Sequence, residues 1–264
     1  MALRVTTWNI NSVRLRQDLV LRVLRELDPD VLCLQEIKVE TELFPHYPYE
    51  AAGYGHRAVF GQKGYHGVAI LSKLPFERGD SPNWCEKGDC RHLAVRLDGI
   101  ELHNFYVPSG GDVPDPAVNE KFAHKLSFVD EMETWFGANR TPSDRMILVG
   151  DLNIAPLEHD VWSHRQLLDV VSHTPIEVEK LTRLQRRTDW VDAVRHFVPA
   201  DQKLYSWWSY RARDWRLSNR GRRLDHIWVT PPLKDALRTQ SILTDARGWE
   251  RGSDHVPVTV DLAV

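Results

Sequence analysis

Hydrophobic residues lie along the chain in short runs, separated by longer stretches in which they recur every three or four positions. Runs of strand length occupy residues 4–10, 31–36, 67–72, 93–97, 100–107, 146–151, 224–229 and 256–262. The last run alternates apolar and polar residues, which is typical of a strand with one buried face. The pattern therefore predicts a β-strand in each run.

Two of the longer stretches have the spacing of amphipathic helices. One carries Leu15, Leu19, Val23 and Leu27, and the other carries Phe122, Leu126, Val129 and Phe136. Residues 80–92 and part of 172–222 lack a clear period, and we expect long loops there. Strands and helices alternate with no linker or strong repeat. The pattern therefore predicts one α/β domain over residues 1–264, with helices covering the sheets.

Composition supports a large buried core and indicates no membrane segment. The chain has 264 residues, of which 42% are hydrophobic, and it contains ten tryptophans. No stretch has the length and apolar character of a signal peptide or a transmembrane helix. The three cysteines, Cys33, Cys85 and Cys90, cannot all pair, which suits a reducing compartment. We therefore expect a cytoplasmic protein with no membrane partner.

Charge is distributed unevenly along the chain. The net charge is −3, yet residues 180–223 hold 12 Lys and Arg against 4 Asp and Glu. Within them, residues 211–223 contain six arginines and one acid. A solvated surface loop is one interpretation of this basic stretch. Tryptophans at 207, 208 and 215 favour another, because arginines interleaved with aromatic side chains suit a phosphate backbone with stackable bases.

Polar side chains with catalytic potential lie at the ends of the predicted strands. They are Asn9, Asn11, Glu36, Tyr106, Asp151, Asn153, Asp225, Asp254 and His255. Any one of them could cap a turn or fill a core position. Together they indicate a site, because ligands bind at strand ends in open α/β sheets. Carboxylate and amide oxygens suit Mg²⁺, so the set predicts metal-assisted attack on a phosphate.

Other kinds of site have weaker support in the sequence. Residues 85–92 contain two cysteines and a histidine but no second ligand pair for zinc, and a surface loop is the simpler interpretation. The sequence has neither a Gly-x-Ser-x-Gly elbow nor a Walker glycine loop. Acyl transfer and nucleotide-driven phosphotransfer are therefore disfavoured.

Eight motifs follow one another along the chain: WNINSVR (8–14), LQEIKV (34–39), GQKGYHGVAIL (61–71), NFYVPSG (104–110), GDLNIAP (150–156), SWWSYR (206–211), NRGRRLDHIWV (219–229) and SDHVPV (253–258). In this order they resemble the bacterial exonuclease III family of apurinic/apyrimidinic endonucleases, part of the endonuclease/exonuclease/phosphatase superfamily. The resemblance spans nearly the whole chain. It implies a four-layer α/β/β/α sandwich, with two packed mixed β-sheets flanked by helices.

The resemblance also implies an activity. It is hydrolysis of the phosphodiester 5′ to an abasic site, dependent on Mg²⁺ or on Mn²⁺ in its place. Accompanying 3′→5′ exonuclease and 3′-repair phosphodiesterase or phosphatase activities are implied as well. The implied partner is double-stranded DNA containing abasic sites or blocked 3′ ends, and no obligate protein partner is expected.

The family's metal and base residues match positions in this sequence. Glu36 would hold the metal, with Asn9 beside it and Asp254 as a further or indirect ligand; one or two ions are both compatible with the family. Asp151 would deprotonate the attacking water, and Asn153 would orient that water or Asp151. An amide next to the base supplies orientation without adding a second negative charge.

The remaining catalytic roles fall on three residues. His255 would stabilise the phosphate in the transition state, and Asp225 would set its tautomer and favour its charged form. Tyr106 would contact the scissile phosphate. Each assignment stands on a position that matches a family motif in this chain.

The implied DNA-binding residues lie within residues 207–224. Trp207, Trp208 and Leu224 would form an apolar pocket for an extruded abasic sugar, which leaves the duplex more readily than a full nucleotide. The expected phosphate and base contacts are Arg211, Arg213, Trp215, Arg216, Arg220, Arg222 and Arg223. Arg222 departs from the family, in which an apolar residue adjoins the pocket. An arginine at this position makes a tight, selective pocket for the abasic sugar less expected and favours a contact between Arg222 and a phosphate.

Two alternatives stay open. Relatives in the superfamily hydrolyse inositol phosphates, sphingomyelin or DNA without a lesion, and fold alone does not decide among them. The basic stretch favours DNA. A protein that holds damaged DNA without cutting it would tolerate a broken catalytic set, whereas this set is complete. A binder should also keep its affinity when metal is removed.

Overall fold

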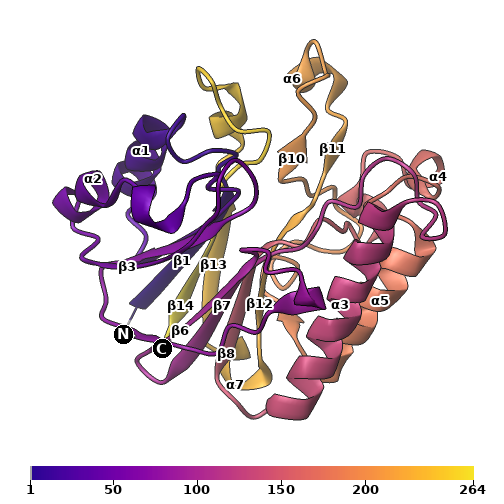
Figure 1. Cartoon of the computed structure of the whole chain (residues 1–264). Coiled ribbons are helices and arrows are strands. Elements are labelled where there is room, and N and C mark those ends of the chain that lie inside the picture. Colours follow the sequence, from indigo (N-terminus) through magenta and orange to yellow (C-terminus); the bar gives the residue numbers. More distant parts are fainter. Residues whose placement is uncertain (1) are drawn as a thin grey trace.

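Two six-stranded mixed β-sheets lie face to face in the computed structural model, which describes residues 2–264 (Figure 1). The first sheet has the order β13 (Leu237–Ile242), β14 (Val258–Ala263), β1 (Ala2–Asn9), β2 (Val31–Gln35), β4 (Val68–Ser72) and β3 (His56–Phe60). The second has the order β5 (Glu77–Arg78), β6 (His92–Leu97), β7 (Ile100–Tyr106), β8 (Met146–Asp151), β12 (Asp225–Val229) and β9 (Val191–Asp192).

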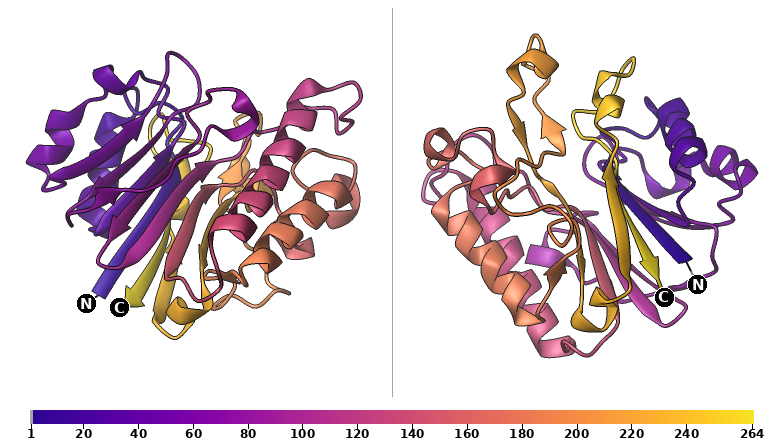
Figure 2. Two further views of the ribbon diagram at one scale, coloured as in Figure 1. Left: turned by 60° about the horizontal axis from the view of Figure 1, so that its bottom comes forward. Right: turned by 180° about the vertical axis from the view of Figure 1, so that it is seen from behind.

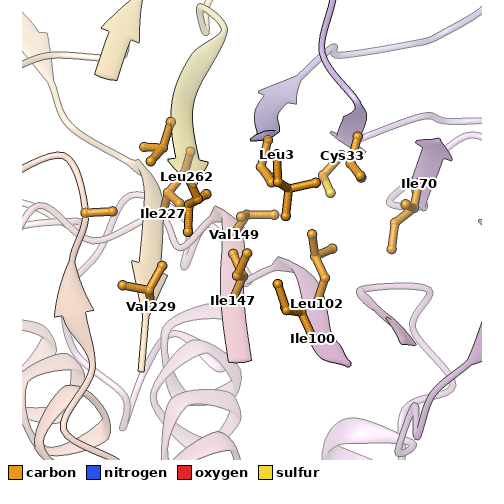
Figure 3. Close-up of a cluster of buried hydrophobic side chains, with 14 of the residues drawn as sticks. Leu3, Cys33, Ile70, Ile100, Leu102, Ile147, Val149, Ile227, Val229 and Leu262 are labelled. Atoms are coloured by element: carbon orange, nitrogen blue, oxygen red, sulfur yellow. The ribbon is translucent and has the colours of Figure 1, made fainter. Parts of the chain in front are cut away.

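Aliphatic side chains from both sheets fill the space between them (Figure 3). Leu3, Cys33, Ile70 and Leu262 come from the first sheet, and Ile100, Leu102, Ile147, Val149, Ile227 and Val229 from the second. The central strands have helices on their other face, which is why residues 146–149 are apolar at every position. Burial of this branched aliphatic layer is the main force that holds the sheets together.

Helices cover the outer face of each sheet (Figure 2). α1 (Gln17–Leu27) and α2 (His46–Ala51) pack on the first sheet, and α3 (Glu120–Asn139) and α5 (Pro175–Arg187) on the second. Short helices and 3₁₀ turns are α4 (His164–Leu167), α6 (Trp215–Ser218), α7 (Pro231–Lys234), η1 (Thr41–Leu43), η2 (Trp84–Glu86), η3 (Glu158–Asp160) and η4 (Thr244–Gly248). The predicted α/β/β/α sandwich is confirmed.

Each sheet contains one parallel strand pair, and the two pairs end at the same edge of the sandwich. β1 runs parallel to β2, and β7 runs parallel to β8. Asn9 ends β1, and Asp151 ends β8 in the other sheet, yet Asn9 Nδ2 donates to Asp151 Oδ2 at 2.9 Å. Gly150 allows β7 and β8 to approach there, because a Cβ atom would overlap the carbonyl oxygen of Phe105. The carboxyl ends of both pairs thus converge on one site.

A small hairpin projects above this edge (Figure 1). It consists of β10 (Trp207–Trp208) and β11 (Gly221–Arg222), with α6 at its tip. Its base is joined to the site by a bridge between Trp207 and His255. The hairpin carries five of the ten arginines of residues 180–223.

All eight predicted strands and both predicted helices are found, with two corrections to the remaining pattern. The expected loop within 172–222 contains the 13-residue helix α5. Leu15 precedes α1 and is 53% exposed, and the buried residues of that helix are Val20, Val23 and Leu24. Within residues 2–264, none of the helices combines the length and the apolar character that crossing a bilayer requires.

Candidate active site

Asp151 lies at the centre of a hydrogen-bonded network at the shared strand edge. Besides Asn9, the neighbouring Asn153 donates to it twice, from its backbone N to Oδ1 at 2.9 Å and from Nδ2 to Oδ2 at 3.0 Å. Asn153 Nδ2 also donates to the carbonyl of Val107 at 2.9 Å. Asn153 has a left-handed φ of 54°, which asparagine tolerates better than most residues. Three donors therefore fix the orientation of a buried carboxylate.

His255 faces Asp151 and is held by Asp225. His255 Nε2 lies 3.7 Å from Asp151 Oδ2, and His255 Nδ1 lies 2.8 Å from Asp225 Oδ2. Strand pairing sets this geometry, since Asp225 of β12 lies opposite Asp151 of β8. Ser206 Oγ donates to Asp225 Oδ2 at 2.6 Å. Asp225 thus keeps a proton on Nδ1 and points Nε2 toward Asp151.

Burial and charge raise the pKa values of both Asp151 and His255. Burial raises the pKa of Asp151 to about 7, against the opposing influence of His255. Burial alone would lower the pKa of His255, but the carboxylates of Asp225 and Asp151 outweigh it and raise the pKa to about 10. At neutral pH His255 is therefore an imidazolium, and Asp151 exchanges readily between its two protonation states.

Glu36 forms the second acidic centre of the site. Its Oε1 accepts hydrogen bonds from Asn9 Nδ2 and from the Tyr106 hydroxyl, both at 2.9 Å. Lys38 Nζ lies 2.8 Å from Oε2 and donates to Asn11 Oδ1 at 2.6 Å. Burial opposes ionisation of Glu36, but the charge of Lys38 lowers its pKa overall. Glu36 is therefore anionic at neutral pH.

The oxygen atoms around Glu36 fit a divalent cation. The ammonium group of Lys38 already lies between oxygens of Glu36 and Asn11, so these oxygens are arranged to bind a cation. Asp254 adjoins the group, because its Oδ1 accepts from Asn11 Nδ2 at 3.2 Å and its Oδ2 from Trp207 Nε1 at 3.0 Å. A donor set made of carboxylate and amide oxygens favours a hard ion.

Asp151, Asp225 and His255 form a second group, whose ligand atoms lie within 4.8 Å of one another. This group is less suited to a metal. It includes a histidine nitrogen, whereas the group around Glu36 offers only oxygen atoms, the ligands that a hard ion prefers. The oxygens around Glu36 are therefore the better candidate for a metal centre.

A cleft of about 780 Å³ opens over both acidic centres. Glu36, Asp151, Asn153, Asp254 and His255 all contribute to its lining. The rest of the lining combines an apolar part, formed by Trp162, Leu167, Val171, Trp207 and Leu224, with polar side chains such as Ser109, Asp112, Gln166 and Ser172. Arg211, Arg220 and Arg222 add three cations. The cleft thus joins acidic centres, an apolar wall and basic side chains in one space.

The structure divides the predicted DNA-binding residues into three groups. Arg211, Arg213, Arg216 and Arg220 are exposed, and Arg220 lies over the Trp162 ring at 4.6 Å. Trp207, Trp215 and Arg222 are half-buried. Trp208 and Leu224 are buried, although Leu224 still contributes to the cleft.

Arg223 is a correction, because it cannot contact DNA from its position. It is 1% exposed and lies between two carboxylates. Its guanidinium donates to both Asp160 oxygens at 2.8 and 2.9 Å and to Asp192 Oδ2 at 2.6 Å. The sequence shows an arginine among arginines, but the fold uses this one in an internal ion-pair network.

The first residues of the basic stretch (180–223) also differ from the prediction that this stretch faces DNA. Lys180 and Arg183 lie on α5, which covers the outer face of the second sheet, and they pair with Asp130 and Glu133 of α3. These cations therefore neutralise a neighbouring helix. The charge available to a ligand in the cleft comes from residues 211–222.

Several residues of the site were missed in the sequence. Lys38 and Ser206 lie inside family motifs, but nothing local shows that they contact Glu36 and Asp225. Lys125 is fully buried, and its Nζ donates to the carbonyl of Asn153 at 2.7 Å. Trp162 had no signal at all, because it lies outside every motif.

The chain is similar in sequence to known proteins. Residues 6–255 match the endonuclease/exonuclease/phosphatase family. The chain belongs to this family. It is 29% identical to an exodeoxyribonuclease III of Haemophilus influenzae and 30% identical to an exodeoxyribonuclease of Bacillus subtilis, each over 97% of this chain and 98% of the relative. It is also 29% identical to the DNA repair nuclease APEX1 of Danio rerio, over 99% of this chain and 83% of that protein.

Solved structures give the same result for the fold. An AP endonuclease from Archaeoglobus fulgidus superposes with a TM-score of 0.92 at 30% identity, over 99% of this chain and 100% of the other. The 3′ phosphatase NExo from Neisseria, bound to a product DNA hairpin, superposes with a TM-score of 0.90 at 28% identity and the same coverage. Membership of this family indicates a nuclease or phosphatase enzyme with a metal-binding acidic site.

Proposed function

We propose that the protein is a DNA repair endonuclease that hydrolyses the phosphodiester 5′ to an abasic site and also acts on blocked 3′ ends. The observation that carries this proposal is the pairing of Asp151 with a protonated His255 in a cleft lined by arginines and apolar side chains. The relatives named above, which are nucleases, an AP endonuclease and a 3′ phosphatase, support the same substrate class.

Asp151 is proposed as the general base. A water molecule in the cleft would give one proton to Asp151 Oδ2 while its oxygen attacks phosphorus. Asn9 and Asn153 hold the carboxylate from other directions, so the base keeps one orientation throughout. The bond between phosphorus and the 3′ oxygen then breaks, and the 3′ oxygen gains a proton.

His255 is proposed to stabilise the negative charge that builds on the phosphate oxygens. Its Nε2 lies on the same side of the cleft as the base, and Asp225 keeps it charged. A fixed cation in a buried site is worth more than the same charge in water, because little solvent has to reorganise. The Tyr106 hydroxyl, which donates to Glu36, is proposed to contact the same phosphate.

The oxygens of Glu36, with Asn9, Asn11 and Asp254 nearby, are proposed to hold Mg²⁺ or Mn²⁺. When bound, such an ion polarises the phosphate and offsets the charge of the leaving oxygen. Lys38 would then either move away from Glu36 or bind the same carboxylate together with the ion. These residues supply only oxygen ligands, which is the preference of both ions.

The apolar wall of the cleft is proposed to receive the abasic sugar. Trp207 and Leu224 contribute apolar surface beside His255, and a sugar without a base would fit against them. Extruding that sugar from the duplex requires less unstacking than extruding a whole nucleotide. Trp208 acts indirectly, because it is buried and supports the hairpin through contacts with Trp215 and Asn219.

The test is incision of a duplex that carries one tetrahydrofuran analogue of an abasic site. We expect a single Mg²⁺-dependent cut on the 5′ side of the analogue, and no cut in an undamaged duplex of the same sequence. EDTA should abolish the reaction. Equal cutting of both duplexes would indicate a nuclease without lesion preference, and no cutting of either would reject the proposal.

Asp151→Asn provides the matched control. The amide keeps the size of the side chain but cannot accept the proton of the attacking water. Loss of a general base typically lowers the rate by about 10²- to 10⁴-fold. A variant that binds the duplex but cuts at the wild-type rate would remove Asp151 from the mechanism.

A further inference from the structure

Arg222 places a guanidinium in the apolar wall of the cleft. It belongs to β11 and pairs in register with Trp207 of β10, and its Cζ lies 5.3 Å from the centre of the Trp207 ring. The surrounding wall is formed by Trp162, Leu167, Val171 and Leu224. A group seated against this wall would therefore meet Arg222 beside Trp207, with Arg220 over Trp162 as the neighbouring cation.

The guanidinium is held in place but only partly used. Its Nη1 donates to the carbonyl of Val171 at 2.9 Å and to Ser172 Oγ at 2.7 Å. Its Nε is buried and has no hydrogen-bond partner. No acceptor for Nη2 lies within bonding distance in the described part of the chain. Of the five N–H donors of a guanidinium, the two on Nη2 are therefore the ones that stay available to a ligand.

The adjacent Arg223 shows what a purely structural arginine looks like in this fold. It lies between Asp160 and Asp192, and its charge is neutralised on two sides. Among residues 2–264, Arg222 forms no ion pair with a carboxylate; its two acceptors are uncharged. Arg222 is half-buried, and keeping such a charge without a carboxylate partner is costly unless a ligand supplies the opposite charge.

Arg222 also lies close to the reacting groups. The Trp207 ring beneath it donates through Nε1 to Asp254, and Trp207 bridges to His255. The backbone of Ser206 donates to the carbonyl of Arg222, while its hydroxyl donates to Asp225. Arg222 is thus connected to His255 and Asp225 through the neighbouring residues Trp207 and Ser206.

We propose that Arg222 is a specificity-determining residue that favours an anionic group on the far side of the scissile phosphate over a neutral deoxyribose. This inference rests on the proposed function. The chemical class it selects is a 3′ end blocked by a phosphodiester that carries a carboxylate, such as 3′-phosphoglycolate. The glycolate would occupy the wall that an abasic sugar otherwise fills, and its carboxylate would accept from Nη2.

The reaction would be the same hydrolysis with a different leaving fragment. Water attacks phosphorus and gives one proton to Asp151, and the bond between phosphorus and the 3′ oxygen breaks. The 3′ oxygen takes up a proton and becomes a hydroxyl. The fragment that leaves is phosphoglycolate, whose phosphate has gained the oxygen of the water, and no oxidant or reductant takes part.

The test compares two duplexes nicked at one position, which differ only in the group on the 3′ phosphate. One carries glycolate, and the other carries the uncharged 2-hydroxyethyl group of similar size. We expect the wild-type enzyme to prefer the carboxylate by about 10- to 100-fold in kcat/KM, the range that one hydrogen-bonded charge contributes. In Arg222→Met this preference should fall to about onefold, and in Arg222→Lys it should be intermediate.

The ratio between the two substrates separates recognition from a structural role. If Arg222 merely tied residues 171 and 172 to β11, Arg222→Met would slow both substrates and leave their ratio unchanged. Arg220→Met is the matched control, because Arg220 also lines the cleft but lies over Trp162. It should retain the wild-type ratio.

Three outcomes would overturn the inference. One is a wild-type enzyme that cuts the abasic duplex but shows no preference for the carboxylate, which leaves the proposed function standing. Another is a preference that persists in Arg222→Met. The third is a wild-type enzyme that cuts neither the abasic nor the nicked duplexes, which rejects the proposed function together with the role of Arg222.

Discussion

Asp151 must be a carboxylate to accept a proton from water, and His255 must be protonated to stabilise the phosphate. Burial raises the pKa of Asp151 to about 7, whereas the carboxylates around His255 raise its pKa to about 10. The active form therefore exists between these values. We expect activity to rise with pH as Asp151 loses its proton and to fall as His255 loses its own.

Asp225→Asn tests the cause of the alkaline limit. Removing the negative charge beside Nδ1 destabilises the imidazolium, so the pKa of His255 should fall and the alkaline limb of the pH–rate profile should move to lower pH. The maximal rate should drop by about 10²-fold or more. The measurement is single-turnover incision between pH 6 and 11. An alkaline limb at its wild-type position would exclude Asp225 as the partner that charges His255.

Arg223 leads to a prediction about stability. Arg223→Met leaves Asp160 with Arg195 alone and Asp192 without its buried partner, which should cost about 3 kcal/mol of unfolding free energy. Thermal unfolding should report a Tm lowered by roughly 6–12 °C. Arg220→Met, at an exposed position, should stay within about 0.5 kcal/mol of the wild type. Equal effects of the two changes would contradict the assignment.

The hydrophobic pattern alone predicts which residue types lie at the site but not their partners; the pairing of His255 with Asp225 came from the family resemblance. Asn9, Glu36, Asp151 and His255 could be identified as candidates because the hydrophobic pattern predicts the strand ends at which they lie. Arg223 was misassigned, since Asp160 and Asp192 lie 63 and 31 residues away along the chain. Long-range ion pairs of this kind leave no local pattern.

The strand edge at which β1, β2, β7 and β8 end is the element that assembles the site. Long strands rich in branched residues were predicted, whereas β3 and β13, which have exposed positions, were not. α5 was missed although Thr174, Pro175 and Glu177 form an N-terminal capping box with proline in the first turn. The helix has few apolar residues among many charged ones, so its apolar stripe is short and hard to recognise in the sequence.

The hairpin of β10 and β11 and the helix α5 divide the basic stretch into two elements with different roles. Arg220→Ala, on the hairpin, should flatten the dependence of log Kd on log salt by about 0.9 if it contacts one phosphate. Arg183→Ala, on α5, should leave that slope unchanged, because Arg183 pairs with Asp130 and Glu133. Fluorescence anisotropy with a labelled duplex measures both slopes.

The reverse result, a slope that changes in Arg183→Ala alone, would place DNA on the outer face of the second sheet. Both variants should fold normally, since each side chain lies at an exposed position. Their unfolding temperatures provide the control for the binding measurement.

For the whole molecule, the sandwich explains why a chain with a net charge of −3 could bind a polyanion. Exposed arginines are found on several surfaces, but the hairpin carries four of them, Arg211, Arg213, Arg216 and Arg220, against one acid, Asp214, and three arginines line the cleft. Alternation of strands and helices predicted an α/β fold, but the four layers came from the family resemblance. Which strands pair across such distances is decided by packing of the two sheets, which no local pattern records.

Hydrolysis in H₂¹⁸O is the measurement that tests the central claim most directly. After incision of the abasic-analogue duplex, mass spectrometry of both fragments locates the labelled oxygen. We expect one ¹⁸O atom on the 5′ phosphate of the analogue fragment and an unlabelled 3′ hydroxyl on the other, as attack of water on phosphorus requires. Label in the 3′ hydroxyl, or no label in either fragment, would contradict hydrolysis by a water activated at Asp151.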